Sequence, residues 1–172
     1  MVLTSFETSR DEIFEVIVAF DGQISDHSFF ERYNLNLRLS ESKESQRGPA
    51  VGRNRGAKLA QGDILFFCDS DASIHADTIQ RIQESFKTNS NCTAIIGCYD
   101  DRPADQGMIS KFRNLLHHRV HYENHGLIKT FWSGCGAIKR QSFLALGRFD
   151  EGFRPASVED IELGYRLSAS GH

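Results

Sequence analysis

Short apolar runs rich in β-branched residues alternate with helical patterns along this chain of 172 residues. FEVIVAF at residues 14–20 and DILFFC at residues 63–68 are too apolar for strands with one face in water, so they predict buried strands. Further strands are expected at residues 92–99 and 131–138, the second of them interrupted by glycines. Strands that alternate with helices favour an α/β fold with a mostly parallel sheet and helices on both faces.

Helices are expected between these strands. Pro49 suits the first turn of a helix over residues 50–60, and Gly62 suits its end. The other expected helices are the end of one at residues 2–9 and those at residues 76–89, 109–124, 139–146 and 158–170. Ligands of such sheets bind beyond the carboxyl ends of the strands, where Asp21 and the Asp69-Ser70-Asp71 group would both project.

Composition narrows the classes of function. A net charge of −3 and a pI of about 6.2 give no electrostatic case for nucleic acid as a partner. The chain starts without a signal peptide, and its apolar runs are far shorter than the ~20 residues that span a bilayer. Four cysteines without C-x-x-C spacing favour reduced, buried thiols over disulfides or zinc. We therefore expect a cytoplasmic protein, which could reach the inner face of a membrane only through segments outside this stretch.

Two pairs of acids are candidates for chemistry. Asp69 and Asp71 stand one residue apart after an apolar strand, where carboxylate oxygens suit Mg²⁺ or Mn²⁺. The alternative is a solvated turn, and the position after DILFFC favours the metal. Glu159 and Asp160 open a predicted helix, where a carboxylate could act as a general base. Read alone, that pair is typical of helix capping and dipole matching, and Glu162 nearby weakens a unique assignment.

Three other segments carry weaker signals. The two arginines of Arg53-Asn54-Arg55-Gly56 could pair with phosphate or be solvated helix charges. Residues 131–136 (FWSGCG) combine an aromatic pair that could stack on a sugar with glycines that allow close approach, or they form a packed bulge. A run of four histidines comprises His117, His118, His121 and His125. The three spaced four apart, His117, His121 and His125, could share one helical face and bind a metal. A polar helix face near the cleft is favoured, because H-E-x-x-H is absent and nearby arginines would repel a cation.

In this order and spacing, four segments resemble the inverting family 2 of glycosyltransferases, which have the GT-A fold of nucleotide-diphospho-sugar transferases. The segments are FEVIVAFDGQISD, GPAVGRNRGAKLAQGDILFFCDSDASIHAD, FWSGCGAIKRQSFLALGRFDEGF and VEDIELGYRLSASGH. The resemblance implies a Rossmann-like sheet and a single partial domain over residues 1–172. Its nucleotide-binding part would cover residues 14–100, and its acceptor and catalytic part residues 101–172.

The resemblance also implies a role for individual residues in binding the donor. Asp21 matches the acid that contacts the uracil or ribose of the donor, and Arg53 matches a position near the base and phosphates. Asp69 and Asp71 match the D-x-D pair, of which the first faces the ribose and metal and the second ligates the metal. Gly134 and Gly136 match a segment that lines the donor-sugar and acceptor site. The implied cofactor is a divalent metal, Mn²⁺ or Mg²⁺.

The implied reaction is a single displacement that inverts the anomeric carbon. Asp160 matches the expected catalytic base, and Glu159 would orient it. The implied partners are a nucleotide-diphospho-sugar donor, by base rate a UDP-sugar, and a glycan, lipid-linked or protein acceptor, as in the biosynthesis of cell-envelope polysaccharides or other glycans. Alternatives are a nucleotidyltransferase-like enzyme that does not use the Glu159-Asp160 base, and an inactive fragment.

The sequence departs from the family at both ends and, to a smaller extent, at Phe20. The first strand of the family, which is central in its sheet, is absent, and the chain stops soon after the Glu159-Asp160 helix. A sheet without a central strand has a gap or two unpaired inner edges, so we expect a marginally stable domain of doubtful activity. Phe20 replaces the acid that usually precedes Asp21, which predicts a less polar pocket for the base.

Overall fold

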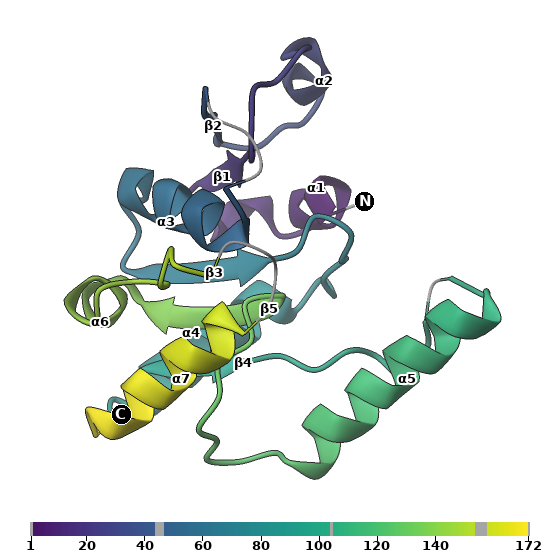
Figure 1. Ribbon diagram of the computed structural model, residues 1–172. Coiled ribbons are helices and arrows are strands. Elements are labelled where there is room, and N and C mark those ends of the chain that lie inside the picture. Colours follow the sequence, from purple (N-terminus) through teal and green to yellow (C-terminus); the bar gives the residue numbers. More distant parts are fainter. Residues whose placement is uncertain (1, 44–46, 104, 154–157, 172) are drawn as a thin grey trace.

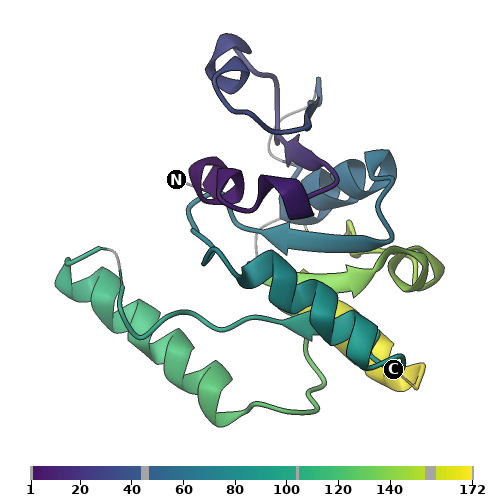
Figure 2. The same cartoon turned by 180° about the vertical axis from the view of Figure 1, so that it is seen from behind.

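A computed structural model describes residues 2–43, 47–103, 105–153 and 158–171 (Figure 1). Its strands are β1 (Val16–Ala19), β2 (Leu37–Ser40), β3 (Ile64–Cys68), β4 (Ala94–Ile96) and β5 (Cys135–Lys139). Its helices are α1 (Val2–Glu7), the 3-10 turn η1 (Arg10–Glu12), α2 (Ser28–Glu31), α3 (Pro49–Leu59), α4 (Thr78–Thr88), α5 (Met108–Glu123), α6 (Arg140–Ala145) and α7 (Glu159–Ala169). Strands and helices alternate, as the sequence predicts for an α/β fold. Figures 1 and 2 show α3 and α7 on one side of the strands and α1 and α4 on the other side.

The strands form two separate sheets. In the first, β1 pairs in parallel with β2, so that Val16 stands opposite Leu37. In the second, the order is β3-β5-β4, and β5 runs antiparallel to both of its neighbours. Neither β2 nor α2 was predicted, and the antiparallel direction of β5 is the exception in a sheet expected to be mostly parallel.

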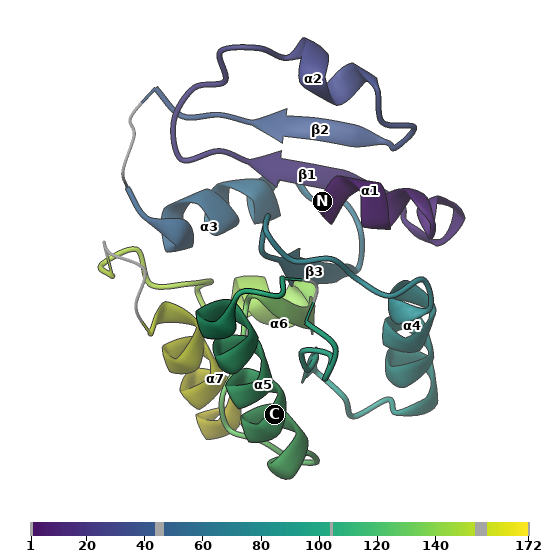
Figure 3. The same ribbon diagram turned by 90° about the vertical axis from the view of Figure 1, so that its right-hand side faces the viewer.

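No strand among the described residues pairs with β1 on its second edge or joins β1 to β3. Within the described residues, the separation of the two sheets agrees with the expectation of a sheet with unpaired inner edges. Figure 3 shows α3 beside both sheets. Gly56 lets α3 lie close to β1, because a Cβ at this position would be 3.5 Å from the Ala19 Cβ and 3.6 Å from the Ile17 Cγ2. Helix α3 thus connects two sheets that share no backbone hydrogen bonds within the described residues.

The main core lies between the second sheet and α3, α6 and α7. Phe131, Phe143 and Phe149 are almost completely buried and surround Phe67 of β3, at ring-centroid distances of 5.2–6.3 Å from it. Leu163 of α7 joins the same cluster. Aromatic rings at these distances add edge-to-face attraction to the burial of apolar area. This cluster fixes the position of α7, which begins with the Glu159-Asp160 pair.

Helix α5 is set apart from the two sheets (Figures 1 and 2). None of its residues is classed as buried. No helix in the described parts of the chain has the length and apolar character needed to cross a membrane.

All four cysteines are free thiols. Cys68 and Cys135 are opposite each other on β3 and β5, and burial raises the pKa of Cys68 to about 12. Burial also raises the pKa of Cys135, so both thiols stay protonated at neutral pH. Cys98 was expected inside a strand over residues 92–99, but β4 ends at Ile96 and the Cys98 side chain is exposed.

Candidate active site

One arginine joins the two acidic motifs. Arg53, on the second turn of α3, donates from Nη2 to Asp69 Oδ1 at 2.9 Å and from Nη1 to Glu159 Oε1 at 2.9 Å. Asp69 follows directly after β3, and Glu159 is the first residue of α7. The side chain of Glu159 is only 5% exposed, whereas that of Asp69 is 40% exposed. Asp69 and Glu159 are 90 residues apart in sequence, and both bind Arg53. Glu159 is the buried partner of the arginine, and Asp69 is the accessible one.

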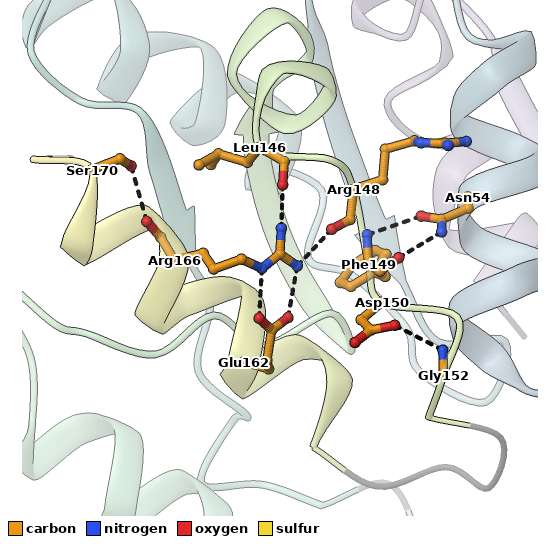
Figure 4. Close-up of polar contacts among 9 residues, drawn as sticks. All are labelled: Asn54, Leu146, Arg148, Phe149, Asp150, Gly152, Glu162, Arg166 and Ser170. Atoms are coloured by element: carbon orange, nitrogen blue, oxygen red, sulfur yellow. Dashed lines mark hydrogen bonds and ion pairs between the residues drawn. The ribbon is translucent and has the colours of Figure 1, made fainter.

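Neighbouring contacts hold Arg53 in place. The Arg53 guanidinium carbon lies 6.0 Å from the centroid of the Phe149 ring, within cation–π range. The next residue, Asn54, is buried, and its amide donates to Phe149 O at 2.8 Å while its Oδ1 accepts from Phe149 N at 3.1 Å (Figure 4). A side-chain amide that satisfies both backbone groups of one residue fixes the turn of α3 from which Arg53 projects.

A second network holds α7. Arg166 forms a two-pronged ion pair with Glu162 at 2.6 and 2.7 Å, and its guanidinium also donates to the carbonyls of Leu146 and Arg148 (Figure 4). Glu162 was a competing candidate for the base. Because both of its oxygens accept from Arg166, it serves in this structure to dock α7 on the segment that follows α6.

Asp160 points to a different partner from Glu159. Its Oδ2 accepts from the backbone N of Ser133 at 3.1 Å and from Ser133 Oγ at 3.0 Å. Ser133 is buried just before β5, so the carboxylate of Asp160 is held against the FWSG segment rather than turned fully to solvent. Oδ2 thus accepts two hydrogen bonds from Ser133. Oδ1 is the less restrained oxygen of Asp160, and it accepts from the Ile161 amide at 2.8 Å.

Asp71 lies in the turn after β3 and is exposed. Burial raises the pKa of Tyr99, and the charges of Asp69 and Asp71 raise it further. Within the residues described, no group of three His, Cys, Asp or Glu side chains is placed to hold a metal ion. The hard oxygens of Asp69 and Asp71 nonetheless suit Mg²⁺ or Mn²⁺, which commonly take the rest of their shell from water and substrate phosphates.

Asp21 lies just after β1 of the first sheet, against the chain that leads into α3. Its Oδ1 accepts from the amide of Arg47 at 3.0 Å and its Oδ2 from the amide of Gly48 at 3.0 Å. Asp21 therefore fixes the approach of the chain to Pro49 and the start of α3. Gly48 has φ of 91°, a conformation that glycine adopts without strain.

The glycines of the FWSGCG segment have a steric reason of their own. A Cβ at Gly134 would lie 2.6 Å from the Trp132 ring, and one at Gly136 would lie 2.4 Å from Trp132 O and 2.7 Å from the Phe131 ring. The space that a side chain would need at Gly134 and Gly136 is therefore occupied by Phe131 and Trp132 of the same segment. The expected strand at residues 131–138 begins only at Cys135, because residues 131–134 fold back over it.

Three aromatic side chains, one from the segment after β4 and two from α5, surround Trp132. Its ring centroid lies 4.9 Å from that of Tyr99, 4.8 Å from that of His121 and 6.5 Å from the parallel ring of His117. His118 is engaged elsewhere, with its Nδ1 2.6 Å from Tyr99 O. The histidines expected on one helical face thus pack on aromatic and backbone groups.

Sequence reasoning did not identify Ser133, Tyr99 or the Arg53 bridge as features of the site. Ser133 lies inside a segment that was singled out for its glycines and aromatic rings, so its position was visible but its partner was not. Tyr99 closes a predicted strand, and nothing in its local sequence indicates two carboxylates nearby. Both contacts join segments that are distant in the chain.

Comparison with known proteins identifies a family that matches this chain. The profile described as "Glycosyltransferase like family 2" matches residues 2–171. Validoxylamine A glucosyltransferase of Streptomyces hygroscopicus subsp. limoneus is 27% identical over 195 residues, which cover 96% of this chain and 43% of that protein. The chain spans 43–54% of the length of the first curated relatives that it matches.

Solved structures share the fold. Residues 1–349 of TarS from S. aureus match with a TM-score of 0.69 and 23% identity, covering 96% of this chain and 49% of that one. The mannosyltransferase PcManGT from Pyrobaculum calidifontis, solved with GDP-Man and Mn²⁺, matches with a TM-score of 0.68 and 23% identity over 99% of this chain and 49% of its own. TarS was also solved with UDP and with UDP-GlcNAc.

Proposed function

Because this chain belongs to the glycosyltransferase-like family 2, we propose that it forms the donor-binding and catalytic core of an enzyme that transfers a sugar from a nucleotide-diphospho-sugar to an acceptor hydroxyl. The observation that carries this proposal is the meeting of Asp69 and Glu159 on Arg53, with Asp160 beside them. Residues 14–100 supply the donor side and residues 101–172 the acceptor side.

The base of the reaction is Asp160. Its Oδ2 is held by Ser133, and among the described residues its Oδ1 accepts a hydrogen bond from the amide of Ile161, so a lone pair remains for an acceptor hydroxyl. Removal of the hydroxyl proton at Oδ1 would activate the oxygen for attack on the anomeric carbon from the side opposite the leaving diphosphate. A single displacement of this kind inverts the anomeric configuration. Glu159 orients this turn of α7 through its ion pair with Arg53.

The donor lies against the accessible acids. Asp69 and Asp71 would hold a Mn²⁺ or Mg²⁺ ion, which when bound offsets the negative charge of the diphosphate. Support comes from the exposed position of both carboxylates at the end of β3 and from the Mn²⁺ complex of PcManGT. We propose UDP as the nucleotide, which the UDP and UDP-GlcNAc complexes of TarS support, although PcManGT was solved with GDP-Man.

Asp21, Arg53, Gly134 and Gly136 complete the proposed donor site. Asp21 follows β1 and is occupied by two backbone amides, so its contribution to the base or ribose is to hold the loop before α3 in position. Arg53 donates to two carboxylates. A phosphate of the donor that bound near Arg53 would compete with Asp69 for the positive charge of the guanidinium. The glycines keep Trp132 close to the sheet beside the site.

The test is a calorimetric titration of this chain with UDP, with and without Mn²⁺. We expect binding that requires Mn²⁺ and is lost in the Asp71→Ala variant, while a Ser73→Ala control two residues further along retains it. Binding of equal strength without metal, or in Asp71→Ala, would refute the proposed metal site. The matched enzymatic test is Asp160→Asn, which should leave UDP binding intact and lower sugar transfer about 10²–10⁴-fold.

A further inference from the structure

Helix α5 presents its polar side to the rest of the protein. Asn114 donates from Nδ2 to Asp100 O at 2.7 Å, and His118 Nδ1 lies 2.6 Å from Tyr99 O. His117 and His121 pack on the Trp132 ring. These four side chains share one side of the helix at 100° per residue. A surface helix usually turns its apolar side to the protein, so the contacts of α5 are the reverse of the common arrangement.

The opposite side of α5 is apolar and exposed. Its seven apolar side chains are between 37% and 85% exposed and span about 160° of the helix circumference. They are Met108, Ile109, Phe112, Leu115, Leu116, Val120 and Tyr122. Leu127, just beyond the helix, is 99% exposed. Exposed apolar side chains that share one side of a helix mark a contact surface, because scattered exposed residues would show no common side.

Basic residues border this face on both sides. On the helical projection Lys111 lies next to Tyr122 at one border, and Arg113 lies next to Val120 at the other. Both are exposed. Arg119 and Glu123, the only acid of the helix, both lie within the face and pair with each other at 2.9 Å. The surface of α5 is thus cationic in a chain whose net charge is −3.

We propose that the exposed face of α5 binds the surface of an anionic membrane, with the helix lying in the plane of the headgroups. This differs from the expectation from sequence, which allowed contact with a membrane only through segments outside this stretch. Apolar residues on one side with Lys or Arg at its borders are the features of helices that lie at this interface. A second copy of the chain is a poorer occupant. In a symmetric contact the same patch would meet itself, which brings the bordering cations of the two copies together. The proposal is independent of sugar transfer, because lipid binding is measured without donor or acceptor.

The test is co-sedimentation of the chain with vesicles of phosphatidylcholine alone and of phosphatidylcholine mixed with phosphatidylglycerol. We expect binding to the anionic vesicles that weakens with added salt. Phe112→Asp should lower the partition coefficient about tenfold or more, from the apolar area that no longer leaves water. The control is Phe14→Asp. Phe14 is 64% exposed and Phe112 is 66% exposed, but Phe14 lies outside α5 and its replacement should change binding less than twofold.

The double variant Lys111→Glu/Arg113→Glu tests the charges separately. It should lose the preference for anionic vesicles while its thermal melt matches that of the unaltered chain, since both side chains are exposed. Equal binding to neutral and anionic vesicles would overturn the proposal, as would equal losses in Phe112→Asp and Phe14→Asp. Analytical ultracentrifugation that shows a dimer abolished by Phe112→Asp, with no lipid binding, would assign the face to a second copy instead.

Discussion

Gly164 offers a test of how tightly α7 is fixed against the core. A Cβ added at this position would lie 2.2 Å from Phe131 N and 2.5 Å from the carbonyl carbon and the Cα of Thr130. These are backbone atoms and cannot rotate away, so Gly164→Ala requires α7 or the chain at residues 130–131 to move. Gly52 provides a matched control, since it is also inside a helix and a Cβ there would meet nothing within 4 Å.

The two substitutions should change stability in opposite directions. In a helix interior, alanine is favoured over glycine by roughly 1 kcal/mol, so Gly52→Ala should raise the free energy of unfolding by up to about 1 kcal/mol. At Gly164 the same gain is opposed by overpacking, which typically costs about 1–3 kcal/mol and more where backbone must shift. We expect a net loss of about 2 kcal/mol. For a chain of this length that corresponds to a fall in Tm of about 4–8 °C.

Urea denaturation followed by circular dichroism, with thermal melts of the same variants, measures both effects. The reasoning would be refuted if Gly164→Ala were as stable as the unaltered chain or gained stability alongside Gly52→Ala. A second readout concerns the site, because a shift of α7 would separate Asp160 from Ser133, which now lie 3.0 Å apart at Oδ2 and Oγ. The mutation should therefore also perturb the amide signal of Ser133, whereas Gly52→Ala should leave it unchanged.

Three further changes probe the polar contacts. Arg53→Met should lower the free energy of unfolding by about 2 kcal/mol in urea titrations, because Glu159 then keeps a buried charge without its arginine. Ser133→Ala should cost about 1 kcal/mol through one lost hydrogen bond to Asp160, and an unchanged urea midpoint would contradict that bond. Burial alone would raise the pKa of Glu15, but hydrogen bonds from two amides and the nearby arginine outweigh it and lower the pKa. The stabilisation from Glu15 is present above pH ~4.3, the pKa of this side chain in the unfolded chain, and is lost as the pH falls through its lower pKa in the folded chain. The free energy of unfolding should therefore decline less in acid for Glu15→Gln than for the unaltered chain.

The strands that sequence predicted best are those that lie in the core. The run at residues 63–68 became β3 because consecutive apolar side chains pack against both layers of helices. The strand β2 was missed although polar and apolar residues alternate strictly over residues 34–40 (NLNLRLS), which is the pattern of a half-buried strand. In the structure its Arg38 bonds to Glu15 and to Leu59 O.

The positions of the acids could be predicted, but their partners could not. Apolar strands and a helix start after residue 157 indicate where Asp69 and Glu159 emerge. The bridge through Arg53 depends on contacts across 16 and 106 residues, set by the packing of α3 against the core. The two donors on Asp160 likewise come from a segment 27 residues away. Contacts of this kind follow from tertiary packing, and a single sequence carries no local signal for them.

The role of α3 explains how a site can be held in a molecule with two unjoined sheets. Three consecutive residues of this helix reach different parts of the structure. Arg53 joins the two acidic motifs and Asn54 binds the backbone of Phe149. Arg55 donates to Ser40 Oγ at 3.0 Å and to the Phe20 carbonyl, at the ends of β2 and β1. The proposed donor site spans Asp21 on the first sheet and Asp69 on the second, so its width depends on α3 rather than on strand pairing. Loosening Arg55 would therefore separate the nucleotide side from the metal side while leaving each sheet intact.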